Sequence, residues 1–340
     1  MSGLLPSGYP FDRKTIVRKV LNIQTNPEWG CDPRRRTIEE LLEFGVIILD
    51  KPPNMTSHEV TAWLAKILNV SSAAHGGTLD PKVTGVLPIA LGRATPIGGL
   101  WLKSDKEYVC VMRLHGDVGE EELRRVFREF TGAIFQRPPL RSAVKRRTRI
   151  RKIHSLELLE IDGRDVLIRI KCQAGTYIRK LCVDIGDVLG VGAHMIDLRR
   201  IRSGIFDEDY SVTMQDIVDG LELWRRTGDD SVLREIIHPA EVGVLHLKRI
   251  IISDKAIGAV TYGAQLYAPG IMAFDYDIVA GETVCLLSVK GELVGLAEVE
   301  VSGPDIGKMT RGKVTRKIRV LMPKGVYPPF WKGEYKKVKT

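Results

Sequence analysis

The residues best suited to chemistry lie between His75 and Pro88, where a carboxylate follows two glycines: His-Gly-Gly-Thr-Leu-Asp-Pro-Lys-Val-Thr-Gly-Val-Leu-Pro. Gly76 and Gly77 let the backbone adopt positive φ and approach another surface closely. Asp80 precedes a proline, which favours an extended or turn conformation at the aspartate. The pattern predicts a carboxylate on a glycine loop at the edge of a core. The same residues also fit an ordinary turn or capping aspartate, so the stretch alone indicates a site without establishing one.

Three further side chains stand next to predicted elements. Lys51 follows a predicted buried strand at 46–49 and precedes two prolines, which fits either a solvated loop lysine or a phosphate or carboxylate contact. Tyr108 begins a predicted strand, a position typical of a half-buried packing tyrosine. Arg179 is expected in the first turn of a helix that follows Gly175, where the helix dipole disfavours a cation. A carboxylate partner for Arg179 is therefore predicted.

Helices and strands are both expected around these residues. Capping-box pairs predict helix starts at Thr37, Thr56 and Thr213, and apolar spacing predicts an amphipathic helix over 120–130. The stretch 156–172 predicts a hairpin that turns at Asp162-Gly163. The remaining expected elements are a short buried strand or helix start at 86–91, strands at 108–114 and 196–206, and a helix from Gly175 to near Gly190.

Charge points to an anionic partner. The 340 residues carry a formal net charge of +9, with 27% charged and 44% hydrophobic residues. Eight of the sixteen residues from Arg137 to Lys152 are Arg or Lys. Such a run fits a solvated, flexible arm, but its arginine content together with the overall charge favours phosphate contacts.

Cysteine spacing and hydropathy narrow the class of protein. The five cysteines are scattered without a Cys-x-x-Cys motif or a nearby His pair, which argues against a structural zinc site and a disulfide framework. No apolar run reaches the ~18 residues that span a bilayer, and no signal-peptide core is evident. The sequence predicts a soluble intracellular protein.

The chain is expected to contain an extended arm at 1–36, a main domain at 37–246, a compact β domain at 247–325 and a short basic tail at 326–340. From about Leu247 the composition shifts to short β segments broken by Gly, Pro and Asp.

Three blocks together resemble the pseudouridine synthases of the bacterial tRNA B-type branch. They are Leu-Asp-Lys-Pro-Pro-Asn-Met-Thr-Ser at 49–57, His-Gly-Gly-Thr-Leu-Asp-Pro at 75–81, and Gly-Thr-Tyr-Ile-Arg at 175–179 with Leu-Arg-Arg at 198–200. Residues 136–145 match the inserted "thumb" loop of that branch, and the C-terminal block resembles its PUA domain. Thr-Ser-His-Glu-Val at 56–60, Leu-Asp-Pro-Lys-Val at 79–83 and the thumb are similar to the dyskerin group, the catalytic subunit of box H/ACA ribonucleoproteins. The lack of long lysine-rich tails indicates an archaeal member. Ala74 departs from the family pattern, where glycine is usual.

The resemblance implies a fold and a set of roles. The fold would be α+β: a catalytic domain with a central mixed or antiparallel sheet flanked by helices, plus a small β-barrel PUA domain. Asp80 would be the catalytic aspartate and Arg179 its partner in a closed site. Tyr108 would stack on the target base and accept the proton from its carbon 5. Lys51 and Leu198 would support the pocket, by charge and by packing respectively. His75 would fill the gap left when the uridine flips out.

The resemblance also implies RNA contacts. The thumb would grip the substrate strand through basic residues, and the PUA segment would read unpaired bases through small residues and backbone groups. The thumb set is Arg141, Lys145, Arg146, Arg147 and Arg149, and the PUA set is Tyr262, Gly263, Ala264, Gln265, Pro269 and Gly270.

The predicted function is RNA-guided isomerisation of uridine to pseudouridine in rRNA, extending to tRNA, in the cytoplasm of an archaeal cell or the nucleolus of a eukaryotic one. The alternatives are a stand-alone tRNA synthase that acts on the T-arm and a non-catalytic ribonucleoprotein scaffold. No metal or organic cofactor is implied. The implied partners are an H/ACA guide RNA, a small zinc-ribbon-like protein, a homologue of the glycine-arginine-rich protein near the thumb, and a kink-turn-binding ribosomal-type protein on the RNA.

Overall fold

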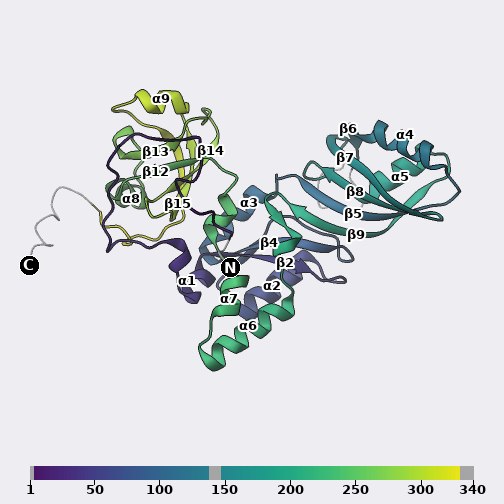
Figure 1. Cartoon of the computed structure of the whole chain (residues 1–340), viewed down its shortest axis with the longest axis horizontal. Helices are drawn as coiled ribbons and strands as arrows, with labels where there is room; N and C mark the ends of the chain where they lie inside the picture. The colour runs from purple at the N-terminus through teal and green to yellow at the C-terminus, as the bar shows by residue number, and fades with distance from the viewer. Residues whose placement is uncertain (1–3, 138–146, 330–340) are drawn as a thin grey trace, which may run out of the picture. The chain divides into compact units, whose positions relative to one another are not determined.

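The computed structural model describes residues 4–137 and 147–329 (Figure 1). They form two compact units, one within residues 47–236 and the other made of the described residues of 4–46 and 237–329. The units divide the chain after residues 46 and 236, and the domain boundaries expected at 36 and 246 stay predictions. Arg141, Lys145 and Arg146 of the predicted thumb lie outside the described residues.

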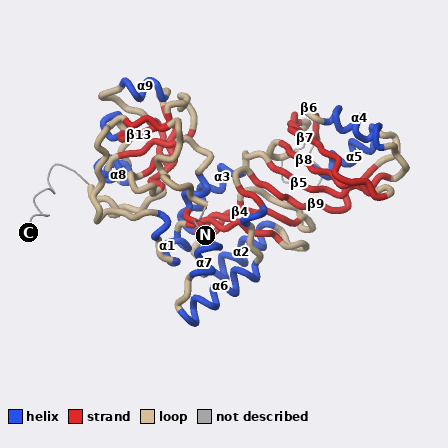
Figure 2. Tube along the Cα trace, viewed as in Figure 1, coloured by secondary structure: helices blue, strands red, loops and turns tan. Residues whose placement is uncertain are grey.

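The unit 47–236 is built on one mixed sheet (Figure 2). Strands β4 and β9 run parallel, and the neighbouring pairs β9–β5, β5–β8, β8–β7 and β7–β6 are antiparallel. The order of the main strands is β2-β4-β9-β5-β8-β7-β6, and β3 and β10 pair with β4 and β9. The strands are β2 (Gly45–Lys51), β3 (Ala73–His75), β4 (Thr84–Leu91), β5 (Lys106–Leu114), β6 (Gly132–Gln136), β7 (Arg149–Asp162), β8 (Asp165–Cys172), β9 (Ala193–Ser203) and β10 (Phe206–Asp207). The helices are α2 (Ser57–Leu68), α3 (Gly98–Trp101), α4 (Glu120–Phe130), α5 (Ile178–Val188), α6 (Met214–Thr227) and α7 (Ser231–Ile236).

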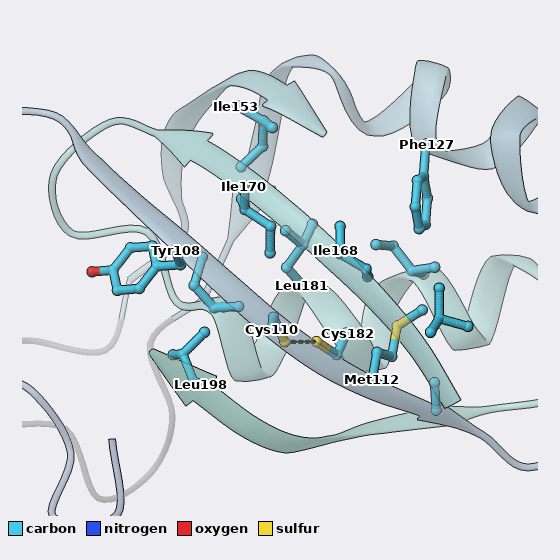
Figure 3. Close-up of a cluster of buried hydrophobic side chains, with 14 of the residues drawn as sticks. Tyr108, Cys110, Met112, Phe127, Ile153, Ile168, Ile170, Leu181, Cys182 and Leu198 are labelled. Atoms are coloured by element: carbon cyan, nitrogen blue, oxygen red, sulfur yellow. Dashed lines mark hydrogen bonds between the residues drawn. The ribbon is translucent and has the colours of Figure 1, made fainter. Parts of the chain in front are cut away.

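A buried core joins the sheet to α4 and α5. Alternate residues of β5 and β8 point into it, where Met112, Ile168 and Ile170 are fully buried, and Phe127 and Leu181 close it from the helices (Figure 3). Burying such side chains stabilises the unit by about 1.5–3 kcal/mol each. This core fixes α5, and with it Arg179, against the sheet.

The locally encoded elements form where the sequence predicts them. Capping boxes are present at Thr37, Thr56 and Thr213, each with both reciprocal hydrogen bonds. The predicted amphipathic helix is α4 with the predicted bounds, and the predicted hairpin is β7–β8 around Gly163. The open choice at 86–91 resolves as a strand, β4.

The other unit contains a six-stranded sheet in the order β1-β13-β12-β14-β15-β16. Its strands are β1 (Ile16–Arg18), β11 (His238–Pro239), β12 (Arg249–Ile252), β13 (Ile271–Asp275), β14 (Thr283–Leu287), β15 (Leu293–Val299) and β16 (Thr315–Val320), of which β11 lies outside this sheet. Its helices are α1 (Ile38–Glu43), α8 (Asp254–Thr261) and α9 (Gly303–Lys308). Within the described residues, the 3-10 segments are 33–35, 92–97, 208–210, 240–244 and 268–270.

The N-terminal arm is part of this second unit. Its strand β1 extends the sheet by pairing antiparallel with β13. Arg13 and Thr15 both bind the carboxylate of Asp275, which is fully buried. Arg36 makes a two-pronged ion pair with buried Glu241, at 2.7 and 2.8 Å. The arm therefore supplies the hydrogen-bond donors and cations that partner two buried carboxylates, Asp275 and Glu241. Its loop-rich sequence does not reveal this role.

The expected basic tail is partly packed. Tyr327 is fully buried and donates a hydrogen bond to Glu292 at 2.6 Å. At least this residue of 326–340 therefore belongs to the core of the second unit.

Candidate active site

Asp80 lies on the loop between β3 and β4, and the backbone on both sides is fixed. Gly77 has a φ of +135°, a conformation that favours glycine. A side chain at Gly76 would lie 2.7 Å from the ring of buried Trp101. The amide of Leu79 donates to the hydroxyl of buried Ser57 at 2.8 Å. Gly76 thus allows the close backbone approach expected from the sequence, and Gly77 allows the positive φ. The hydrogen bond to Ser57 holds the loop just before Asp80.

The carboxylate of Asp80 forms an ion pair with the guanidinium of Arg179. Arg179 is in the first turn of α5, so its unfavourable place near the helix N-terminus is offset by the predicted carboxylate. Both side chains are 55% exposed. The expected closed site is therefore open to solvent here, because no described segment covers the pair. A ring entering from solvent can reach the carboxylate.

The start of α5 is held by a residue that the sequence did not single out for this role. Gln136, at the end of β6, is buried and makes two hydrogen bonds with the backbone of Tyr177. Its side-chain NH2 group donates to the Tyr177 carbonyl at 3.1 Å, and its side-chain oxygen accepts from the Tyr177 N–H at 3.0 Å. Arg151 donates to the carbonyl of Gly175 at 3.1 Å. The entry to the thumb and the helix that carries Arg179 are thereby joined. The signal available in the sequence was a glutamine at the start of the predicted insert.

Tyr108 and Leu198 lie at one end of the core, on neighbouring strands β5 and β9 (Figure 3). Tyr108 is 8% exposed, and its ring lies at the edge of the buried cluster (Figure 3). Burial raises the pKa of the phenol, and the nearby charge of Arg200 acts in the opposite direction. Leu198 is buried opposite Cys110, so its predicted packing position is found. The catalytic roles of both residues stay predictions.

Lys51 differs from both readings of its sequence. Its side chain is fully buried, and the ammonium donates to the carbonyls of Pro52, Met55 and Pro81 at 2.7, 2.6 and 3.0 Å. The interpretation of Lys51 as a solvated loop lysine is therefore wrong. All three ammonium hydrogens are used by these carbonyls, so none is left to bind a phosphate or carboxylate. Burial lowers its pKa. Lys51 supports the pocket by tying the loop after β2 to the residue that follows Asp80.

His75 ends β3 and packs edge-on against His58, with ring centroids 4.8 Å apart. Burial, with smaller effects from His58 and Arg200, lowers its pKa to about 4. The ring is therefore neutral near pH 7 and suited to stacking rather than to charge.

The predicted RNA contacts are only partly visible. Arg147 is exposed, whereas Arg149 is half-buried at the start of β7 and its Nε has no hydrogen-bond partner. Tyr262 is exposed, with the ammonium of Lys324 5.2 Å from its ring centroid. Gly263 has a φ of +101°. Within the same segment, Ala264 is half-buried and Pro269 is exposed.

Two residues of the PUA segment have contrasting environments. The side-chain oxygen of Gln265 is buried and has no hydrogen-bond partner. By contrast, a side chain at Gly270 would lie 2.7 Å from Cβ of Ala256 on α8. Gly270 is therefore required by packing within the unit, whereas the buried oxygen of Gln265 is an acceptor without a partner.

Within residues 4–137 and 147–329, no group of three or more His, Cys, Asp or Glu side chains is placed to hold a metal ion. None of the helices in these ranges is both long and apolar enough for a membrane span.

Family comparisons cover nearly the whole chain. Models described as TruB family pseudouridylate synthase (N terminal domain) and tRNA pseudouridylate synthase B C-terminal domain match residues 65–178 and 179–245. A DKCLD domain model matches 11–61 and a PUA domain model 248–321. A protein of Methanopyrus kandleri called "Probable tRNA pseudouridine synthase B" is 52% identical over 97% of this chain and 98% of its own length. The chain belongs to the TruB family of pseudouridylate synthases.

Other TruB-family relatives agree in sequence and in fold. The protein of the same name from Methanocaldococcus jannaschii is 50% identical over 94% of this chain and 95% of its own. A chain in the crystal structure of a Cbf5-Nop10-Gar1 complex is 49% identical, with a TM-score of 0.86 over 92% of this chain and 95% of that one. A chain in the structure of an H/ACA RNP bound to a substrate RNA containing 2'-deoxyuridine is 46% identical, with a TM-score of 0.87 over 93% and 97%. This TruB-family chain is a pseudouridine synthase with an RNA-binding PUA domain.

Proposed function

We propose that this pseudouridine synthase is the catalytic subunit of an H/ACA ribonucleoprotein, in which a guide RNA selects uridines of rRNA, and also of tRNA. The observation that carries the proposal is the match, over 93% of the chain at a TM-score of 0.87, to a chain of an H/ACA RNP that holds substrate RNA. A similar match to a chain from a Cbf5-Nop10-Gar1 complex adds support.

The site supports isomerisation of a flipped uridine. Asp80 is open to solvent yet held by Arg179, so a base extruded from its stack can meet the carboxylate. Asp80 then acts at the ribose anomeric carbon or an adjacent atom while the uracil detaches, turns and rejoins through carbon 5. Tyr108 provides the ring beneath the base, and its phenol oxygen is the group proposed to take the proton from carbon 5. The Asp80–Arg179 pair disfavours the purely scaffolding alternative, which has no need for it.

The PUA segment is the proposed anchor for the ACA end of the guide. Gln265 lies in this segment, and its buried side-chain oxygen has no hydrogen-bond partner within the described residues. Exposed Tyr262, beside Lys324, offers a ring for base stacking. The predicted thumb set, of which Arg147 and Arg149 are among the described residues, is proposed to hold the substrate strand through its phosphates.

A hollow beside the thumb supports a protein partner there. It has a volume of about 440 Å³ and lies between β6, α4 and α5. Phe135 and Val188 expose 74% and 51% of their surfaces next to it, and Glu129, Asp184 and Asp187 supply acidic groups. An apolar hollow with an acidic rim suits a basic partner, so we place the homologue of the glycine-arginine-rich protein here. The zinc-ribbon-like protein and the kink-turn-binding protein complete the proposed particle.

The second candidate is a stand-alone tRNA synthase. The relatives called "Probable tRNA pseudouridine synthase B" favour it. Purification of the chain from its native cell, followed by sequencing of the bound RNA, separates the two. Hairpins with an ACA end support the guided function, whereas tRNA alone contradicts it.

A binding experiment tests the guide anchor. Because the arm and the PUA block form one unit, point variants are preferable to deleting residues 247–340. Gln265→Ala and Tyr262→Ala should each weaken binding of an ACA guide and reduce the preference over a guide with a mutated ACA. Tyr276→Ala, which changes another exposed tyrosine of the same unit, is the control. Unchanged discrimination in both test variants would place the anchor elsewhere.

A further inference from the structure

Arg200 is a buried cation that none of the roles above uses. It lies on β9 with 1% of its surface exposed. No carboxylate in the described part of the chain lies within 4.0 Å of its guanidinium. Burial lowers its pKa, and its charge is in turn one cause of the lowered pKa values of Lys51 and Lys106. An unpaired buried charge is costly, and a well-packed apolar residue would be more stable in a purely structural position.

The guanidinium joins the two ends of the loop that carries Asp80. Its Nε donates to the carbonyl of Val86 at 2.8 Å, and one terminal nitrogen donates to the carbonyl of Gly77 at 3.2 Å. Gly77 and Val86 lie on opposite sides of Asp80 in the sequence. The planar fork of an arginine can satisfy both acceptors at once, whereas an ammonium offers no such fixed pair of directions.

The charge of Arg200 also acts on the phenol of Tyr108, where it lowers the pKa that burial raises. Tyr108 and Arg200 are opposite each other in the antiparallel β5–β9 pair. On the other side of β9, Arg200 pairs with Gly85 of β4, and a side chain there would lie 2.2 Å from the Arg200 carbonyl oxygen. The main chain of Arg200 is therefore held between the strand that follows Asp80 and the strand that carries Tyr108.

We propose that Arg200 is a positioning residue that fixes the Asp80 loop and the Tyr108 side chain relative to each other. The inference rests on the proposed roles of Asp80 and Tyr108 in uridine isomerisation. Arg200 is buried, so it acts through these two groups and does not touch RNA. Its loss should slow the chemical step and leave RNA affinity unchanged.

Two variants separate positioning from charge and folding. Arg200→Lys keeps the charge without the fork, and Arg200→Gln keeps a planar N–H donor without the charge. Arg202→Lys is the matched control, because Arg202 lies on the same strand with its side chain 46% exposed and paired with Asp207. Circular dichroism shows which variants are folded at the assay temperature, and the folded ones are compared.

Single-turnover rates and dissociation constants are measured on the RNA that the wild-type chain modifies. A folded Arg200 variant should be at least tenfold slower, with its dissociation constant within twofold of wild type. Arg202→Lys should stay within twofold in both. If the wild-type chain is inactive on guided RNA but active on tRNA, the guided function is contradicted. The Arg200 and Arg202 variants are then compared on tRNA, so the positioning role is still tested.

A double-mutant comparison supplies the readout that a general structural defect would not change. Because Arg200 acts partly through Tyr108, Arg200→Lys should cost a smaller factor in a Tyr108→Phe background than in wild type. Equal factors in the two backgrounds, or a wild-type rate in Arg200→Lys, would overturn the proposal.

Discussion

Lys106 should make the stability of the unit 47–236 depend on pH. It is 5% exposed, and its ammonium donates to the carbonyls of Trp101 and Ser104, both at 2.7 Å. Burial, followed by the charge of Arg200, lowers its pKa from 10.5 to about 7. Cys172 and Asp105 act weakly in the opposite direction.

The sign and size follow from proton linkage. Between pH 7 and pH 10.5 the lysine of the unfolded chain still binds a proton that the folded lysine has lost, so the free energy of unfolding rises with pH. The slope approaches about 1.4 kcal/mol per pH unit. From pH 7 to pH 9, allowing for partial titration at pH 7, Lys106 should add roughly 2–3 kcal/mol.

The measurement compares wild type with Lys106→Met by urea unfolding at pH 7, 8 and 9, followed by circular dichroism. Taking the difference removes groups common to both proteins. The free energy of unfolding of wild type should rise relative to the variant by the amount above. Lys103→Met, which removes an exposed lysine three residues earlier, is the control for the loss of a lysine side chain. Parallel wild-type and Lys106→Met curves would show that Lys106 does not titrate in this window.

Three further predictions concern the site. Asp80→Asn should reduce isomerisation to background while RNA affinity stays within twofold, because the shape is kept and the charge of the reactive group is lost; tritium release and filter binding measure both, and turnover above background would contradict the role. Arg179→Lys should lower the single-turnover rate at least tenfold, or ~1.4 kcal/mol of barrier, because an ammonium cannot hold the Asp80 carboxylate as a guanidinium does; a near wild-type rate would make Arg179 merely structural. Gln136→Leu should lower the same rate several-fold by releasing the start of α5, whereas Gln215→Leu, on an exposed part of α6, should not; equal rates in the two would remove Gln136 from the site.

Sequence reasoning succeeded where the signal is local. Capping boxes place both partners within four residues, so Thr37, Thr56 and Thr213 mark helix starts by themselves. The Asp162-Gly163 turn likewise specifies its hairpin. The partner of Arg179 was predictable because its position in a helix first turn requires a nearby negative charge.

It failed for buried cations that bind carbonyl oxygens. Lys51, Lys106 and Arg200 are held by backbone acceptors, and a backbone acceptor leaves no side-chain pattern in the sequence. The pairing of Gln136 with Tyr177 spans 41 residues and depends on the packed sheet. Such contacts appear only once the tertiary structure is known.

The pairing of β1 with β13 has a consequence for how the chain is made. Ile16 pairs with Asp275, so the first strand to leave the ribosome has no partner until about 260 more residues have been synthesised. At roughly 5–20 residues per second, that delay is about 13–50 s. Residues 47–236 are complete about 40 residues earlier and form a compact unit of their own. Strand β1 therefore stays unpaired while the intervening residues are synthesised. A factor that covers residues 4–46 during translation would protect the nascent protein from aggregation in this interval.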